Sequence, residues 1–252
     1  MIFHYPQRKL SQENIPHLKI NGITINQTKE FNFLGLTISE TMQWNDHINK
    51  ISNKISKTIG MMYRIKKFVN QSILKLIYNA LILPHLNFSL LCWGFSINRL
   101  IKLQKKAVRV ICKSKYNAHT EPLLKSTNLL KVTDIFKINT LKFIYKYRND
   151  KLPDYFYGML DDVQIETNHE YNTRHQNTLI PRTQTPNRST TNNSLRYSAP
   201  RLLENTPDCI TEKLSKHSLD GFNRYAKRHF IDEYKIQCLI SNCYQCRTQV
   251  AE

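Results

Sequence analysis

Adjacent carboxylates could hold divalent metal ions for phosphoryl or nucleotidyl transfer. Asp161-Asp162 is the only pair of neighbouring aspartates in the 252-residue chain. A metal-binding pair of this kind would be expected in a turn between two apolar strands. This pair instead follows Pro153 and Tyr157-Gly158 near the end of a helix, so we interpret it as part of a solvated loop. With only 6 glycines there is no phosphate-cradling loop, and no Ser or Cys lies in a nucleophile turn. The residues therefore predict no catalytic residue and no cofactor in this chain.

The cysteines near the C-terminus form the second group with metal-binding chemistry. Cys238, Cys243 and Cys246, with His229 upstream, could supply four zinc ligands. However, Cys243 and Cys246 are half of a zinc knuckle without a second half, in a part of the chain that frays. We favour the alternative, an unbound cysteine-bearing tail. Six cysteines are too few for a disulfide scaffold and indicate a reducing, intracellular compartment.

Basic side chains dominate one part of the sequence. The formal net charge is +18, and residues 47–120 hold 14 basic and no acidic residues. Soluble segments normally mix both signs, so this exclusion of acids predicts a polyanionic partner such as nucleic acid. A basic face that is merely solvated is the alternative. The sequence has neither a long apolar run nor a signal peptide, so we expect no membrane association.

Two amphipathic helices carry most of this charge. Isoleucines at three- and four-residue steps predict a helix from Asn45, which Asn45 or Asp46 could cap, and Leu100, Ala107 and Ile111 predict another over 98–113. Their polar faces carry the cations predicted to contact phosphates: Lys50, Lys54, Lys57, Arg64, Lys102, Lys105, Lys106, Arg109 and Lys113. Tyr63 and Tyr116 could stack on bases, although tyrosines are more often core or rim residues.

β-structure is predicted before these helices. Asn21-Gly22 lies between two apolar-alternating segments and predicts a type I′ hairpin. Residues 30–38 read as a strand-forming run with Gly35 inside it, which indicates either close approach of another backbone or a bulge.

Helices are predicted in most of the remainder. One spans 71–83 and ends or kinks at Pro84, one begins at Thr120, another covers 133–147, and the last lies near 214–234. Residues 168–193 are polar and predicted to be extended. The fold class is therefore α+β, mainly α: a short N-terminal β-hairpin and strand segment, a helical bundle and a helical C-terminal region.

The chain resembles a known family in ten short sequence segments, which occur in the same order as in that family. The segments are 1–4, 18–22, 30–38, 44–48, 78–88, 93–94, 103–109, 118–123, 171–174 and 196–200. Together they resemble the end of the palm, the thumb and the C-terminal region of non-LTR retrotransposon reverse transcriptases, jockey-like elements in particular. The sequence departs from that pattern at 199–204, where relatives usually have Gly-Pro-x-Leu-Trp-Asn.

The resemblance implies roles for two segments. Phe33, Leu34 and Gly35 match the primer grip, and residues 47–113 match the thumb that closes on an RNA template and DNA primer. The parent RNA-directed DNA polymerase would use Mg²⁺ at aspartates upstream of this chain, so we expect this fragment alone to be inactive. A nuclear location also follows from the resemblance. The alternatives are a stand-alone nucleic-acid-binding module and a non-functional product of a decayed element.

The resemblance also divides the chain. The expected divisions are a palm remnant at 1–44, a basic helical thumb-like domain at 45–118, a helical connection at 119–165, a polar extended linker at 166–200, a C-terminal helical segment at 201–236 and a cysteine-containing tail at 237–252.

Overall fold

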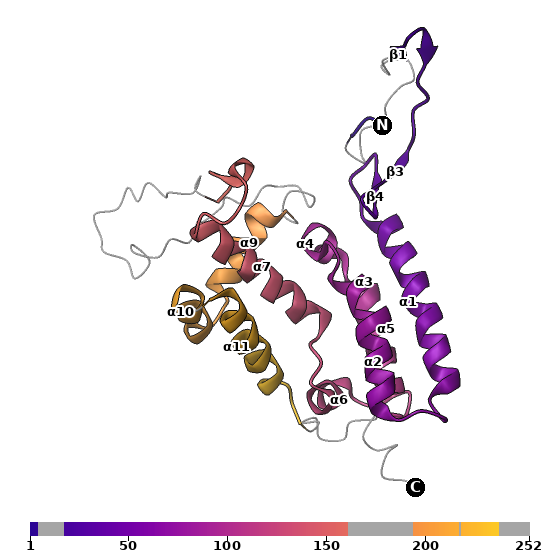
Figure 1. Ribbon diagram of the computed structural model, residues 1–252, viewed down its shortest axis with the longest axis vertical. Helices are drawn as coiled ribbons and strands as arrows, with labels where there is room; N and C mark the ends of the chain where they lie inside the picture. Colours follow the sequence, from indigo (N-terminus) through magenta and orange to yellow (C-terminus); the bar gives the residue numbers. More distant parts are fainter. Residues whose placement is uncertain (5–17, 161–193, 217, 237–252) are drawn as a thin grey trace, which may run out of the picture.

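The computed structural model describes residues 1–4, 18–160, 194–216 and 218–236 (Figure 1). Several sequence predictions lie outside these residues: the Asp161-Asp162 pair, the polar segment over 168–193, and the zinc candidates Cys238, Cys243 and Cys246. The described part is mainly helical with short N-terminal strands, which confirms the predicted fold class.

Two antiparallel hairpins form the N-terminal region. β1 (Lys19–Ile20) pairs with β2 (Ile23–Thr24), and Asn21 and Gly22 have φ values of 49° and 81°, as a type I′ turn requires. This confirms the first predicted hairpin.

The run over 30–38, which we interpreted from its residues as strand-forming with Gly35 inside it, is also a hairpin. β3 (Glu30–Phe33) pairs with β4 (Leu36–Ser39) through a turn at Leu34 and Gly35, whose φ values are 47° and 85°. Gly35 is therefore a turn residue rather than a bulge within a strand, and its positive φ accounts for the glycine.

The basic segment folds into packed helices. Asn70 caps the second of them, because its side chain accepts a hydrogen bond from the Ile73 amide at 2.9 Å. Pro84 lies in the first turn of the third, which confirms the predicted break. The N-cap of the first is Trp44 rather than Asn45 or Asp46, and no side chain caps it. The elements are α1 (Asn45–Ile65), α2 (Gln71–Leu81), α3 (Leu83–Asn87), α4 (Leu90–Trp93), η2 (Gly94–Ser96) and α5 (Asn98–Ile111).

The C-terminal helices begin at Thr120, as predicted. Their bounds are α6 (Thr120–Thr127), α7 (Val132–Arg148), η3 (Asp154–Phe156), α9 (Leu195–Glu204), α10 (Asp208–Lys216) and α11 (Leu219–Asp232). α9 begins inside the expected linker, because buried Ala199 and Leu203 are one turn apart and belong to the core that α7 also lines. The single helix predicted near 214–234 is wrong at its start, since the Ser218 side chain caps α11 by accepting from the Gly221 amide.

Two apolar cores hold these helices together. The first joins α1, α2 and α5 and includes Trp93, whereas the second joins α7 to α9, α10 and α11 around Phe222. α7 contributes to both, with Ile135 in the first and Leu141 in the second. Figure 1 shows α7 and α11 beside the group formed by α1, α2 and α5.

Candidate nucleic-acid interface

The two basic helices, α1 and α5, pack against each other directly. Ile51 and Ile55 of α1 and Leu100 of α5 belong to the same core. At their N-terminal ends, Arg99 donates a hydrogen bond to the side chain of Asn49, so the helices run in the same direction. Because both of these side chains are exposed, the polar faces of the two helices adjoin at this end.

This surface is rich in cations and nearly free of acids. On α1 and α5 the one acidic residue is Asp46, in the first turn of α1, where it favours the helix dipole. We define the basic face as the exposed lysines and arginine of this surface: Lys50, Lys54, Lys57, Arg64, Lys102, Lys105, Lys106 and Lys113. All eight were predicted from the sequence to contact phosphates.

Lys50 has a partner within the chain. Its Nζ lies 3.3 Å from a carboxylate oxygen of Glu30 on β3, and both side chains are 54% exposed. Exposed ion pairs are worth at most about 1 kcal/mol, so a phosphate could compete with Glu30 for this ammonium group. The pair also links the second hairpin to the start of the basic face.

Arg109 differs from the other predicted cations. It is half-buried, and its Nε donates a 2.8 Å hydrogen bond to the carbonyl oxygen of Ala118. Burial lowers the pKa of its guanidinium. Because this side chain fastens the segment between α5 and α6, we leave it out of the basic face.

His47 lies under the start of the basic face. It is buried, its Nδ1 accepts a 3.3 Å hydrogen bond from the Thr37 amide, and its ring makes edge contacts with Trp44 and Trp93. Burial, together with the charges of Lys50 and Lys54, lowers its pKa. The neutral imidazole thus joins β4 to α1 without adding to the positive charge.

Aromatic side chains flank the C-terminal ends of the basic helices. Tyr63 and Tyr116 are 60% and 88% exposed, so both rings are free to contact a ligand. Lys66 Nζ lies 4.1 Å from the centroid of the Tyr63 ring, which gives this tyrosine a cation–π partner.

The primer-grip-like turn projects from the second hairpin. Phe33 is 53% exposed and Leu34 is 79% exposed, and a Cβ on Gly35 would meet the Phe88 ring at 3.4 Å. In Figure 1 this hairpin continues directly into α1. The turn therefore places exposed apolar side chains beside Phe88, while the open end of the same hairpin contacts the basic face through Glu30 and Lys50.

Sequence reasoning missed Arg99 as the residue that links the two basic helices, and it is not counted in the basic face because its guanidinium is bonded to Asn49. Its guanidinium joins α5 to α1. The acid-free composition of 47–120 includes Arg99, but periodicity alone did not single it out, because its role depends on which helix packs beside α5.

No family model, curated protein or solved structure matches the chain. Within the described ranges, no group of three or more His, Cys, Asp or Glu residues could hold a metal ion. None of the helices there is long and apolar enough to cross a membrane.

Proposed function

We propose that this chain binds the sugar-phosphate backbone of a nucleic-acid duplex through the basic face of α1 and α5. The observation that carries the proposal is the placement of seven exposed cations on two adjoining helices, and of Lys113 just after the second, with Asp46 as the one acidic residue on these helices. Such a surface attracts phosphates and releases condensed counterions when they bind. A merely solvated surface gains nothing from excluding acids.

The basic face would recognise the negative charge of the phosphates rather than the sequence of the bases. Its cations are mostly lysines, which act as compact point charges on flexible stems and contact phosphates without fixed geometry. Contacts of this kind position a duplex but do not discriminate between bases. We therefore expect similar affinity for duplexes of different sequence and a strong dependence on salt.

The resemblance to non-LTR retrotransposon reverse transcriptases makes the proposal more specific. On that basis the basic face belongs to a thumb that holds an RNA template and DNA primer, and Phe33, Leu34 and Gly35 contribute a primer grip. The exposed tip of the second hairpin supports a contact at this position. Metal-binding aspartates and Mg²⁺ would come from the parent polymerase, and this chain would bind without polymerising.

The exposed apolar side chains favour the interpretation that this chain acts as part of a larger protein over the alternative of a stand-alone nucleic-acid-binding module. Ile20 and Ile23 of the first hairpin are 63% and 74% exposed, and Phe31 of the second is 53% exposed. Large apolar side chains with this exposure commonly pack against another protein surface where they form a patch. A decayed, non-functional product would instead be expected to aggregate through these strands on expression.

Fluorescence anisotropy with a labelled RNA/DNA hybrid tests the proposal. Replacement of Lys57, Arg64 and Lys102 by Gln should weaken binding at least tenfold, because three of the phosphate contacts are lost. A control variant replaces three exposed lysines away from α1 and α5, and these are Lys19, Lys146 and Lys235. It removes the same charge and should keep most of the affinity. Equal losses in both variants would refute a localised face.

A further inference from the structure

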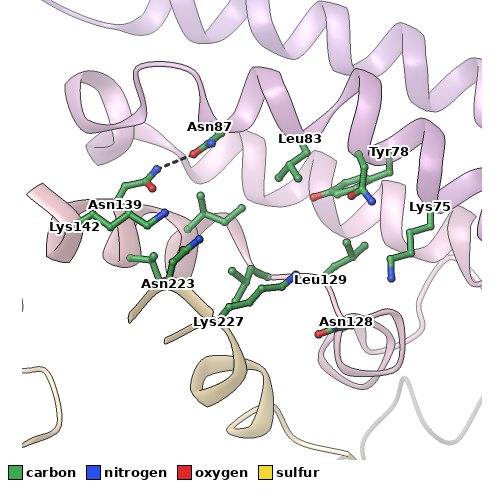
Figure 2. A pocket seen from close by; sticks show the side chains of 14 residues that line it. Lys75, Tyr78, Leu83, Asn87, Asn128, Leu129, Asn139, Lys142, Asn223 and Lys227 are labelled. Carbon is green, nitrogen blue, oxygen red and sulfur yellow. Dashed lines mark hydrogen bonds between the residues drawn. The ribbon is translucent and has the colours of Figure 1, made fainter. Parts of the chain in front are cut away.

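A second cation-rich site lies on the other side of α2. A cleft of about 340 Å³ opens between α2 and α3 on one wall and α7 and α11 on the other (Figure 2). In Figure 1 these walls face each other, whereas α1 lies beyond α2. The cleft is therefore separate from the basic face, and its volume is at the lower end of the range for small-molecule sites.

The polar lining of the cleft repeats on three helices. Each helix contributes one lysine and one asparagine about one helical turn apart, so both side chains lie on the same face. The pairs are Lys75 and Asn79 on α2, Lys142 and Asn139 on α7, and Asn223 and Lys227 on α11. In Figure 2, Lys142 and Lys75 lie toward opposite ends of the cleft, and Lys227 lies between them.

The lining of the cleft includes three lysines and no carboxylate, so the net charge of the lining is positive. Burial and the charge of Lys146 lower the pKa of the Lys142 ammonium, and the charge of Asp220 acts in the opposite direction. Among the described residues, no ion pair is formed by Lys75, Lys142 or Lys227. Burial raises the pKa of Tyr78 to about 12, so the Tyr78 hydroxyl stays neutral and adds no negative charge to the cleft.

The remaining lining gives the cleft an apolar floor. Leu129 and Ile138 are 6% and 3% exposed, and Tyr78 is 1% exposed, with its hydroxyl accepting a 2.8 Å hydrogen bond from Gln104. Apolar side chains of this kind can cover the flat face of a base, while amides can bond to its edge. The Asn139 amide donates to Asn87 at 2.7 Å, but Asn79 and Asn223 make no side-chain hydrogen bond within the described residues.

We propose that this cleft binds a nucleoside polyphosphate, with Lys75, Lys142 and Lys227 around the phosphates and Asn79 and Asn223 against the sugar or base. The inference is independent of duplex binding by the basic face. The nucleotide could be free in solution or be the phosphorylated end of a strand, because both present the same phosphate and base chemistry.

Isothermal titration calorimetry on the full chain near physiological salt tests this site with ATP, inorganic tripolyphosphate and a short 5′-triphosphorylated oligonucleotide. We expect one ATP per chain and at least a tenfold loss of affinity in the Lys142→Gln, Lys227→Gln variant. The Asn79→Ala, Asn223→Ala variant should weaken ATP binding and leave tripolyphosphate binding intact. Tighter binding of the oligonucleotide than of ATP assigns the site to a strand end, and the reverse assigns it to a free nucleotide.

Circular dichroism first checks that each variant folds, and Lys75→Gln with Lys227→Gln replaces any variant of Lys142 that does not. The matched control is Lys102→Gln with Lys106→Gln on the basic face, which should weaken duplex binding and leave ATP binding unchanged. Absence of ATP binding, or binding that falls in this control but not in the cleft variant, would overturn the site. Loss of duplex binding alone would leave it standing.

Discussion

Arg109 and Ala118 are joined by a 2.8 Å hydrogen bond from the guanidinium Nε to the backbone carbonyl oxygen. This bond crosses the connection between α5 and α6, which carries Lys113 and the exposed Tyr116. Arg109 thus stabilises the backbone of the connection that carries Lys113 and Tyr116. The basic residues of 47–120 accordingly include exposed cations as well as arginines, Arg99 and Arg109, whose guanidinium groups make hydrogen bonds within the fold.

Replacement of Arg109 by Lys should lower stability while keeping the charge. The lysine cannot place a planar Nε donor at the Ala118 carbonyl, so we expect a loss of about 1 kcal/mol in the free energy of unfolding. Urea denaturation measures it, with Lys105→Arg as the control on the same helix. If Arg109→Lys leaves the unfolding midpoint unchanged but weakens duplex binding, the residue belongs to the basic face instead.

Replacement of Tyr234 by Phe should destabilise the contact between the C-terminal helix and α7. The Tyr234 hydroxyl donates to Asp134 at 2.6 Å and accepts from the Lys131 amide at 2.8 Å. Burial and the Asp134 carboxylate raise its pKa, so it remains a donor. Phe would strand both partners at a cost of about 1–3 kcal/mol. Tyr155→Phe, at a position 92% exposed, should change nothing in the same thermal melt.

Local patterns predicted most of the helices and the first hairpin, because each of these depends on neighbours in sequence. Asn21-Gly22 requires only its own turn chemistry, and the isoleucines of α1 require only a 3.6-residue period. The break at Pro84 follows equally from the missing amide hydrogen. The boundary errors arose where tertiary packing decides, as in α9, which α7 stabilises although its sequence reads as polar linker.

The sites were predictable to different degrees for the same reason. The cations of the basic face lie on α1, on α5 or just after it, so charge and periodicity were sufficient to predict that their side chains are exposed. The structural role of Arg109 is a hydrogen bond to Ala118, nine residues later, and this bond could not be predicted from helical spacing. The cleft was missed because Lys75, Lys142 and Lys227 come together only when α2, α7 and α11 pack.

His47 should make the protein less stable in acid. Its pKa lies below the ordinary value of 6.5 because of burial, Lys50 and Lys54. The unfolded chain therefore binds a proton more readily than the folded chain, and stability falls as the pH drops below about 6.5. His85, whose pKa burial and Lys54 also lower, acts in the same direction.

Urea midpoints at pH 7 and pH 5 measure this contribution. His47→Asn offers an oxygen near the position of Nδ1 without a titrating ring, so its midpoint should fall less between the two pH values. His85→Asn provides the comparison for the second histidine. An equal fall in wild type and His47→Asn would show that the imidazole does not contribute.

The turn of the second hairpin should tolerate Asn better than a β-branched residue. Gly35→Val forces a side chain into φ near +85° and should cost about 1–2 kcal/mol of local stability. Leu34→Asn should instead stabilise the turn, since Asn adopts positive φ more readily than Leu. Amide hydrogen exchange in β3 and β4 measures both effects. Gly60→Ala, in open space within α1, is the control and should stabilise the helix.

The salt dependence of duplex binding tests the central proposal most directly. With about five or six phosphate contacts, the plot of log Kobs against log salt concentration should have a slope of roughly −4 to −6 for an RNA/DNA hybrid. A variant with four Gln substitutions, at Lys57, Arg64, Lys102 and Lys106, should remove about 3 to 4 from the magnitude of that slope while its circular dichroism spectrum stays unchanged. An unchanged slope in the folded variant would contradict the assignment of nucleic-acid binding to α1 and α5.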